Sequence, residues 1–205
     1  MSEETRDRIL DAAAGLFARR GYAAVAMRDI AVAAGMSKAG LYHHFEGKEL
    51  LLVEILEREL EAERPLLAEL GRRELPWRRR LSAWIEAVLA LPPERSSVVV
   101  RLGQESAQLD PPRRREVGAR YKARFLDPLL AFLEEGEGEG LVRPGCARMG
   151  LWILLGTLSA FLQTQARGRD LPRDPATLAP ELAAAFVDGI GTGRARPVAR
   201  PRLRC

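Results

Sequence analysis

The chain has 205 residues, of which 47% are apolar and 29% are charged, and its net charge is +4 at pH 7. This composition excludes a chain that is disordered as a whole, because enough apolar surface is present to offset the loss of chain entropy on folding. The five arginines after Gly191 account for the positive excess, since residues 1–190 carry a net charge of −1. The overall basicity therefore does not by itself indicate a nucleic-acid partner.

Sequence features that would place the chain in or beyond a membrane are not evident. No apolar stretch reaches the roughly 20 residues that a membrane span needs. The first residues, Ser2, Glu3 and Glu4, do not have the pattern of a signal peptide. Two cysteines, Cys146 and Cys205, are too few for a disulfide framework or a zinc site. We therefore expect a cytoplasmic protein with no membrane partner.

Apolar side chains recur at three- and four-residue spacing along nearly the whole chain, which is typical of amphipathic helices. We predict an all-α fold of about nine helices. They cover about residues 5–20, 28–34, 38–44, 48–71, 77–91, 95–109, 112–138, 147–167 and 175–190. The first is expected to end at Arg19, Arg20 and Gly21, two cations followed by a glycine that suits a left-handed cap.

The predicted helices divide into two domains. Residues 1–47 are expected to form a compact three-helix head, and residues 48–190 a larger helical body. Residues 191–205 are rich in arginine and proline and are expected to form a disordered tail.

Residues 27–45, MRDIAVAAGMSKAGLYHHF, have the spacing of a helix-turn-helix. Ala31 is small enough to let a second helix approach, and Gly35 suits a turn with positive φ. Leu41 is placed to fill the angle between the two helices, and Ser37 is placed to cap the second helix. A generic corner between two helices would have the same spacing.

The outward face of the second helix favours the DNA-binding interpretation. With Leu41 and Phe45 turned inward, this face presents Lys38, Ala39, Tyr42 and His43, with no acidic residue among them. An ordinary solvated face would be richer in glutamate. A short helix with a cation and small residues near its start suits the major groove, and cations nearby suit DNA phosphates.

The stretch GYAAVAMRDIAVAAGMSKAGLYHHFEGKELLL resembles the N-terminal DNA-binding domain of the tetracycline-repressor (TetR) family, and the resemblance covers about residues 5–52. Its most specific part is LYHHF followed three residues later by lysine. The resemblance implies an all-helical homodimer whose heads bind a palindromic operator in double-stranded DNA. It also implies a body that contains a small-molecule pocket and a helical dimer interface.

The resemblance assigns roles to matching positions in the head. It implies that Lys38, Ala39, Gly40 and His43 face base edges, whereas Tyr42, His44 and Lys48 hold phosphates or position the helix. The full set of predicted DNA-binding residues is Arg28, Ser37, Lys38, Ala39, Gly40, Tyr42, His43, His44 and Lys48. Many family members have Ser or Thr just before this arginine. Here Ala26 and Met27 take that place, so the sequence does not predict the cap and the phosphate contact that such a hydroxyl would make.

Adjacent residues of a helix diverge by about 100°, so His43 and His44 do not predict a shared metal ion. No cofactor is expected either. The sequence contains no Glu-x-x-His pair, phosphate loop or nucleophile elbow, and both histidines lie in the head, so we do not predict an enzyme.

The body is expected to bind an apolar effector and a second copy of the chain. Predicted helices 147–167 and 175–190 occupy the place where family members form a four-helix dimer interface, although a merely buried pair would look the same. Each candidate pocket residue is also typical of a plain core. These candidates are Trp84, Val88, Leu102, Gln104, Tyr121, Phe125, Leu129, Trp152 and Phe161.

The run from Val98 to Val142 resembles family members that sense fatty acyl-CoA or related acyl-CoA esters. Arg113, Arg114 and Arg115 would then hold CoA phosphates, or else form a solvated helix start. The sequence thus predicts a homodimeric transcriptional repressor that a small apolar effector, with acyl-CoA as the expected class, releases from its operator. The alternatives are a helical lipid- or acyl-CoA-binding protein or enzyme that retains the helix-turn-helix as scaffold, and a non-specific DNA binder that uses the Arg-rich tail.

Overall fold

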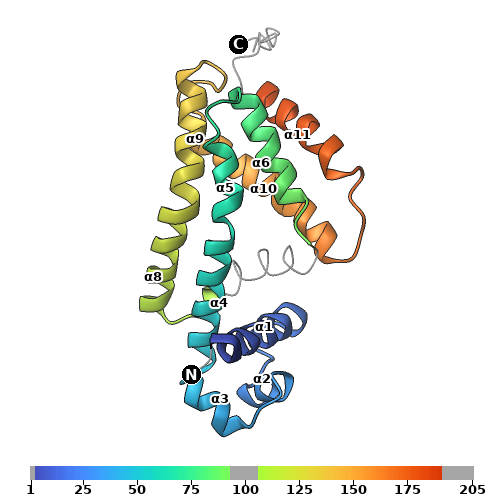
Figure 1. Cartoon of the computed structure of the whole chain (residues 1–205). Coiled ribbons are helices and arrows are strands. Elements are labelled where there is room, and N and C mark those ends of the chain that lie inside the picture. The colour runs from blue at the N-terminus through green and yellow to red at the C-terminus, as the bar shows by residue number, and fades with distance from the viewer. Residues whose placement is uncertain (1–2, 93–105, 191–205) are drawn as a thin grey trace, which may run out of the picture.

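The computed structural model describes residues 3–92 and 106–190, and no strand occurs among them, which confirms the predicted all-α class (Figure 1). No helix within these two ranges is both long and apolar enough to cross a bilayer. The elements are α1 (Glu3–Arg20), α2 (Met27–Ala33), α3 (Lys38–His44), α4 (Lys48–Ala62), α5 (Arg64–Leu70), α6 (Trp77–Leu89), the 3-10 turn η1 (Ser106–Gln108), α8 (Pro111–Tyr121), the π-helical turn η2 (Lys122–Leu126), α9 (Asp127–Gly138), α10 (Ala147–Ala166) and α11 (Pro175–Ile190).

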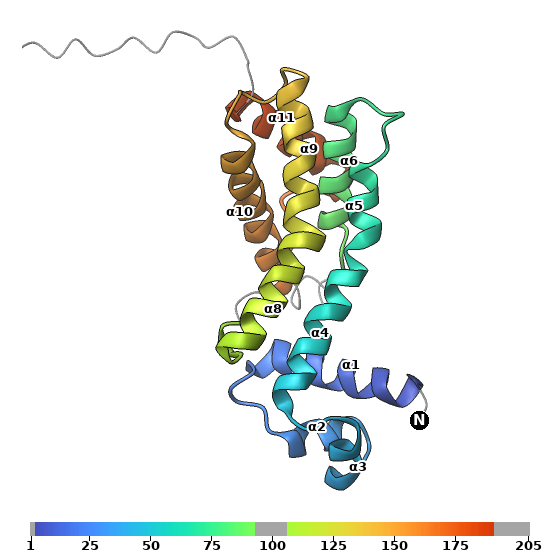
Figure 2. The same ribbon diagram turned by 90° about the vertical axis from the view of Figure 1, so that its left-hand side faces the viewer.

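Helices α1, α2 and α3 form a head at one end of an elongated molecule, and the other helices form a taller bundle (Figures 1 and 2). Helix α4 belongs to both parts, because it packs on α1 in the head and on α8 in the body. Its Leu51, Leu52 and Ile55 are fully buried in the head's core. Farther along the same helix, Leu60 belongs to the core of the body.

The helix predicted at residues 48–71 is two helices that meet at Glu63. Pro65, the second residue of α5, has no N–H to donate to the turn before it, which interrupts the hydrogen-bond ladder. The next ladder begins at once, since the Leu67 N–H donates to the Glu63 carbonyl at 3.0 Å. The prediction therefore covered the right residues but missed the break between α4 and α5.

The helix predicted at residues 112–138 contains the π-helical turn η2, which precedes Pro128 in α9. A proline again removes a donor from the ladder, and a wider turn accommodates the missing bond. The helix predicted at 95–109 lies largely outside the described residues, as does the predicted tail at 191–205; residues 106–108 form η1.

A buried arginine joins three helices of the body. Arg80 of α6 has a side chain only 3% exposed, and it forms an ion pair with Glu135 of α9. It also donates to the Leu70 carbonyl at the end of α5, at 2.9 Å, and lies 5.2 Å from the Phe132 ring centre. The hydrogen bond with Glu135 raises the pKa of Arg80 and lowers the pKa of Glu135.

Candidate nucleic-acid interface and body cavity

The corner between α2 and α3 has the geometry that the sequence predicts. Gly35 has φ of +66°, in the left-handed region that favours glycine. The Met36 N–H donates to the Ala31 carbonyl at 3.0 Å and so closes the turn. Ala31 and Leu41 are buried between the helices. The apolar inner face of the corner thus fixes which residues of α3 point outward.

The outward face of α3 is exposed. Lys38, Ala39, Tyr42 and His43 all lie on it, and Tyr42 is 44% exposed. The Lys38 ammonium lies 5.7 Å from the centre of the Tyr42 ring, so these two side chains share one patch. His44 is half-buried at the end of the helix. We call Lys38, Ala39, Tyr42 and His43 the α3 face.

Ser37 and Gly40 shape the start of α3. The Gly40 N–H donates to the Ser37 hydroxyl at 3.0 Å, the capping bond predicted for that serine. A Cβ at position 40 would lie 3.3 Å from the same hydroxyl, a close contact that glycine avoids. Both residues thus define where the exposed helix begins.

Asp29 makes a capping bond at the start of α2, where Ala26 has no side-chain oxygen to accept from the N–H groups of the first turn. Its carboxylate accepts from the Ala26 N–H at 3.2 Å and lies 3.4 Å from Arg20. The next-door Arg28 is exposed, as a DNA contact requires. An acid three residues after a helix start is the signal that could have predicted this cap.

Lys48 makes contacts within the head, and the sequence analysis did not identify their partners. Its ammonium donates to the carbonyls of Tyr22, at 2.8 Å, and Val25, at 2.9 Å. It also lies 4.2 Å from the centre of the Tyr22 ring. Lys48 therefore ties the start of α4 to the loop between α1 and α2, and its phosphate contact stays a prediction.

Arg6 of α1 fixes α3 and α4 in the head. Its guanidinium pairs with Glu54 of α4, donates to the His44 carbonyl at 3.2 Å, and lies 4.3 Å from the Phe45 ring centre. The sequence analysis did not single out Arg6, since a lone cation on a first helix is usually solvated. The effect is that α3 is carried rigidly by α1 and α4.

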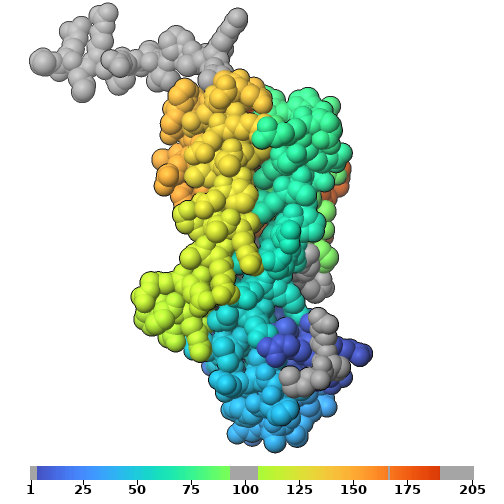
Figure 3. Space-filling model, turned by 60° about the vertical axis from the view of Figure 1, so that its left-hand side comes forward, coloured from blue at the N-terminus to red at the C-terminus, as the bar shows by residue number. Residues whose placement is uncertain are grey.

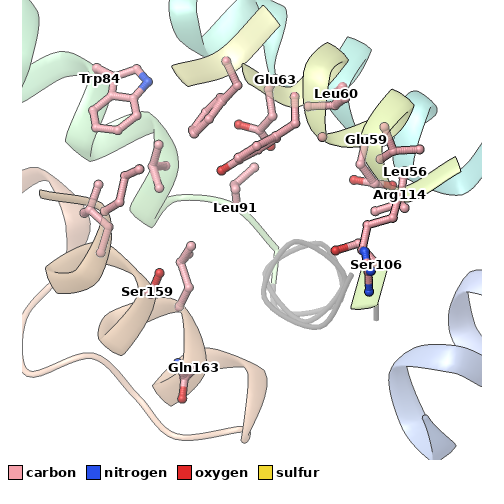
Figure 4. Close-up of a pocket in the computed structure, with 18 residues that line it drawn as sticks. Leu56, Glu59, Leu60, Glu63, Trp84, Leu91, Ser106, Arg114, Ser159 and Gln163 are labelled. Carbon is pink, nitrogen blue, oxygen red and sulfur yellow. The ribbon is translucent and has the colours of Figure 1, made fainter. Parts of the chain in front are cut away.

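The body contains a cavity of about 510 Å³ between α4, α6, α8 and α10 (Figure 4). Ligand pockets of proteins usually have volumes in this range. Four predicted pocket residues line it, namely Trp84, Val88, Tyr121 and Phe125. Further apolar lining residues are Leu56, Leu60, Leu91, Val117, Leu155, Leu158 and Leu162.

Three predicted pocket residues are not in the lining. Leu129 lies one turn beyond Phe125 and is fully buried in the body's core. Trp152 is 61% exposed on the outside of α10. Phe161 precedes the lining residue Leu162 and so points about 100° away around the helix. The predictions for Leu102 and Gln104 fall outside the described residues.

Two carboxylates in the cavity wall were not predicted. Glu59 and Glu63 both line it, and Glu63 is only 8% exposed. They follow Leu56 and Leu60 at the three- and four-residue spacing of one helix face, which is the signal that was overlooked. Loss of water around the Tyr121 hydroxyl, together with the negative charge of Glu63, raises the pKa of Tyr121 to about 12. That hydroxyl is therefore neutral at physiological pH.

The cavity wall and the head are connected through α4 and α8. Leu56 and Val117 line the cavity and also belong to the head's core. Beside them, Arg113 pairs with Glu49 at 2.6 Å. Farther along, Arg120 pairs with Glu57, and Arg124 pairs with Glu61 at 2.6 Å. Figure 3 shows α8, in yellow-green, against α4 directly above the head.

The arginines predicted to hold CoA phosphates have different surroundings. Arg114 lines the cavity. Arg113 is used in the ion pair with Glu49, and Arg115 is exposed. Of the three, Arg114 is the one positioned to meet a ligand in the cavity.

Residues 9–55 match the family model described as "Bacterial regulatory proteins, tetR family". The repressor KstR2 of Rhodococcus jostii is 55% identical over 51 residues, which are 25% of each chain. The chain thus spans about a quarter of the length of the curated relatives it matches.

Two solved structures are similar over nearly the whole chain. KstR2 of Mycobacterium tuberculosis, described as a ketosteroid transcriptional regulator, has a TM-score of 0.74 and 25% identity, covering 93% of this chain and 97% of that one. AibR, solved in complex with isovaleryl coenzyme A and operator DNA, has a TM-score of 0.73 and 27% identity, covering 91% and 98%.

Proposed function

We propose that this chain, whose residues 9–55 match the tetR family of bacterial regulatory proteins, is a homodimeric transcriptional repressor that a small effector releases from its operator. The observation that carries the proposal is the exposed α3 face on a rigid helix-turn-helix. The face contains a cation, a phenol and an imidazole and no acid. Such a helix fits the major groove, where these groups read base edges or hold phosphates.

The remaining predicted DNA contacts support the same docking. Arg28 at the start of α2 is exposed on the helix that would cross the backbone, and Ser37 and Gly40 set the end of α3 that enters the groove. The His44 carbonyl holds the end of α3 by accepting from Arg6, and Lys48 holds the start of α4 against the loop between α1 and α2. We propose that they act mainly on helix placement and that Lys38, Ala39 and His43 meet base edges.

Lys38→Ala is expected to weaken binding to the preferred operator by about ten- to a hundredfold and to relax base preference at one position, because a base contact is lost. Fluorescence anisotropy with the operator and with single-base variants measures both effects. Lys122→Ala, which removes a cation from the body, is the control and should leave both unchanged. If Lys38→Ala instead weakens all duplexes equally, Lys38 contacts a phosphate.

We propose that α10 and α11 form the dimer interface. Met149, Trp152 and Ile153 of α10 are 64%, 61% and 43% exposed, an unusual concentration of large apolar side chains on one surface helix. Small residues continue the same side of α10 at Gly156 and Ala160, so a second helix can approach closely. A dimer places two heads on successive major grooves, roughly 34–36 Å apart.

Trp152→Asp is expected to convert the dimer to monomers at micromolar concentration, because a charge cannot be buried unpaired in an apolar interface. Sedimentation velocity measures the change, and operator affinity should fall at the same time. Ala131→Asp on the exposed side of α9 is the matched control. A dimer that persists in Trp152→Asp would place the interface elsewhere.

We propose the cavity as the effector site and acyl-CoA as the effector class. An acyl chain suits its apolar walls, and Arg114 suits a phosphate of the CoA. AibR, which has a similar fold, was solved with an acyl-CoA bound. The effector must bind the DNA-incompetent arrangement more tightly than the DNA-bound one, and Leu56 and Val117 provide the contact between cavity and head.

The test is to select duplexes from a random pool with the full chain and measure binding by anisotropy at physiological salt with excess competitor DNA. Palmitoyl-CoA is then added. We expect a palindromic sequence that survives competition and is released by the acyl-CoA. If the chain binds the selected duplex and palmitoyl-CoA does not release it, acyl-CoA is not the effector, and the repressor proposal stands. Failure to select any sequence would favour a helical acyl-CoA-binding protein that retains the helix-turn-helix as scaffold.

A further inference from the structure

The cavity ends part-way along α6. Its lining residues on this helix, Trp84, Val88 and Leu91, follow one another at the three- and four-residue spacing of one helix face. In the other direction the same face continues with Leu81 and Trp77, which are buried in the core of the body and do not line the cavity. The side of α6 that faces the cavity therefore stops at Trp84.

Two further walls of the cavity end in the same way. Phe125 of η2 lines the cavity, whereas Leu129, about one turn farther along, is fully buried in the core. Leu155 of α10 lines the cavity, whereas Leu151, about one turn earlier, is buried in the core. Because α6 and α10 run towards the head and η2 leads away from it into α9, all three walls end on the side away from the head (Figures 1 and 2).

Packed core closes the body beyond this end of the cavity. The rings of Trp77 and Phe132 stack with their centres 4.8 Å apart, and the Trp77 indole N–H donates to the Phe132 carbonyl at 2.8 Å. Leu81 and Leu129, each about one turn nearer the cavity on the same two helices, are fully buried. A ligand that reaches Trp84 would therefore meet a wall that is several side chains deep.

The opposite end of the cavity is polar. Figure 4 shows Arg114 and Ser106 together at one end, Trp84 at the other, and Leu91 between them. Arg114 is exposed, whereas Trp84 is 1% exposed. A ligand with an anionic end and an apolar chain would therefore place its charge at Arg114 and extend its chain towards Trp84.

We propose that Trp84 is the floor of the cavity and sets the length of the longest unbranched acyl chain that binds, a role that rests on the proposed effector site. Each methylene group that becomes buried strengthens binding by about fourfold. A chain whose end already touches the Trp84 ring cannot bury a further methylene group. The gain in affinity with chain length should therefore stop at the floor.

The test uses saturated acyl-CoA esters whose chains grow in two-carbon steps from six to eighteen carbons. Isothermal titration calorimetry with the full chain, below the concentrations at which the esters form micelles, measures each affinity. We expect affinity to rise by up to about fifteenfold per step and then to stop rising, at a length that we call the break point. A rise through the whole series, or no binding at any length, would overturn the proposal.

Two variants should move the break point in opposite directions. Trp84→Leu lowers the floor, so the break point should move to a longer ester. Val88→Phe adds a ring one turn nearer the middle of the cavity, so the break point should move to a shorter ester. Leu91→Ala, which removes apolar volume between the two ends, is the control and should keep the break point of the natural chain.

Circular dichroism checks that each variant is folded, and Val88→Phe decides the matter if Trp84→Leu does not fold. A break point that stays in place in the folded test variants would contradict the assignment of the floor. An equal shift in Leu91→Ala would also contradict it, because the limit would then depend on the volume of the whole cavity.

The floor and the proposed function have separate measurements. Release of the operator by acyl-CoA tests the function, whereas the break point tests the floor. If acyl-CoA releases the operator and the break point is the same in all variants, the function stands and the floor assignment is lost. If the break point moves as expected and no ester releases the operator, Trp84 is the floor of a binding site that does not control DNA binding.

Discussion

Arg80→Met is expected to lower the free energy of unfolding by about 3–5 kcal/mol, the usual cost of removing one partner from a buried ion pair. Arg80 is 3% exposed, and its loss would leave Glu135 without its partner and the Leu70 carbonyl without a donor. Methionine retains most of the apolar stem, so the cavity it leaves is small. Urea unfolding followed by circular dichroism measures the change.

The ion pair between Arg80 and Glu135 also predicts how the stability of the fold depends on pH. Because Arg80 lowers the pKa of Glu135, the folded state is stabilised above the usual pKa of a glutamate and loses this stabilisation as the pH falls below it. The difference in stability between the natural chain and Arg80→Met should therefore shrink as the pH falls. Arg79→Met, at an exposed neighbour, is the control and should change stability by less than about 0.5 kcal/mol. A difference that stays constant down to low pH would show that Arg80 acts through packing alone.

Lys48→Met is expected to destabilise the head by about 2–3 kcal/mol. The substitution removes a charged donor from two backbone carbonyls and a cation from the Tyr22 ring. The carbonyls of Tyr22 and Val25 would then have to accept hydrogen bonds from water at the edge of the head's core. Hydrogen exchange of the amides of α1 and α2 should become faster by the factor that this loss of free energy implies. Exchange of the amides of α9 should stay the same.

Lys38→Met is the matched control for Lys48→Met, because the same atoms are changed on an exposed side chain. It should leave amide exchange in the head unchanged. If both variants behave alike, the two carbonyl contacts of Lys48 contribute nothing measurable. A loss of operator affinity in Lys48→Met would then have to come from a lost phosphate contact.

The head was predictable in detail because its constraints are local. Gly35, Ser37 and Leu41 act through bonds and contacts within a few residues, and the structure places each as the spacing indicates. The contacts of Arg6 and Lys48 cross more than 20 residues of sequence, and periodicity contains no information about such pairs. Arg6 looked like a solvated residue before the fold was known, and Lys48 was assigned a role without its partners.

The body was predictable as helices but less so as a site. Trp84 and Phe125 were expected to line a pocket and do so, whereas Trp152 was expected there and faces outward. An aromatic residue on an apolar helix suits a pocket, a core or an interface equally well. Glu59 and Glu63 were passed over because glutamate is usually solvated, and only the placement of α6 and α10 across the cavity makes that side of α4 a cavity wall.

Helix α4 limits which parts of the molecule can change independently. Leu56 and Val117 belong at once to the cavity wall and to the head's core, so altering their size to suit another ligand also alters the packing of the head. The α6 and α10 walls are not part of the head's core, because Val88 and Leu158 belong to the core of the body. New ligand preferences should therefore be acquired, by design or by evolution, through substitutions on the α6 and α10 walls.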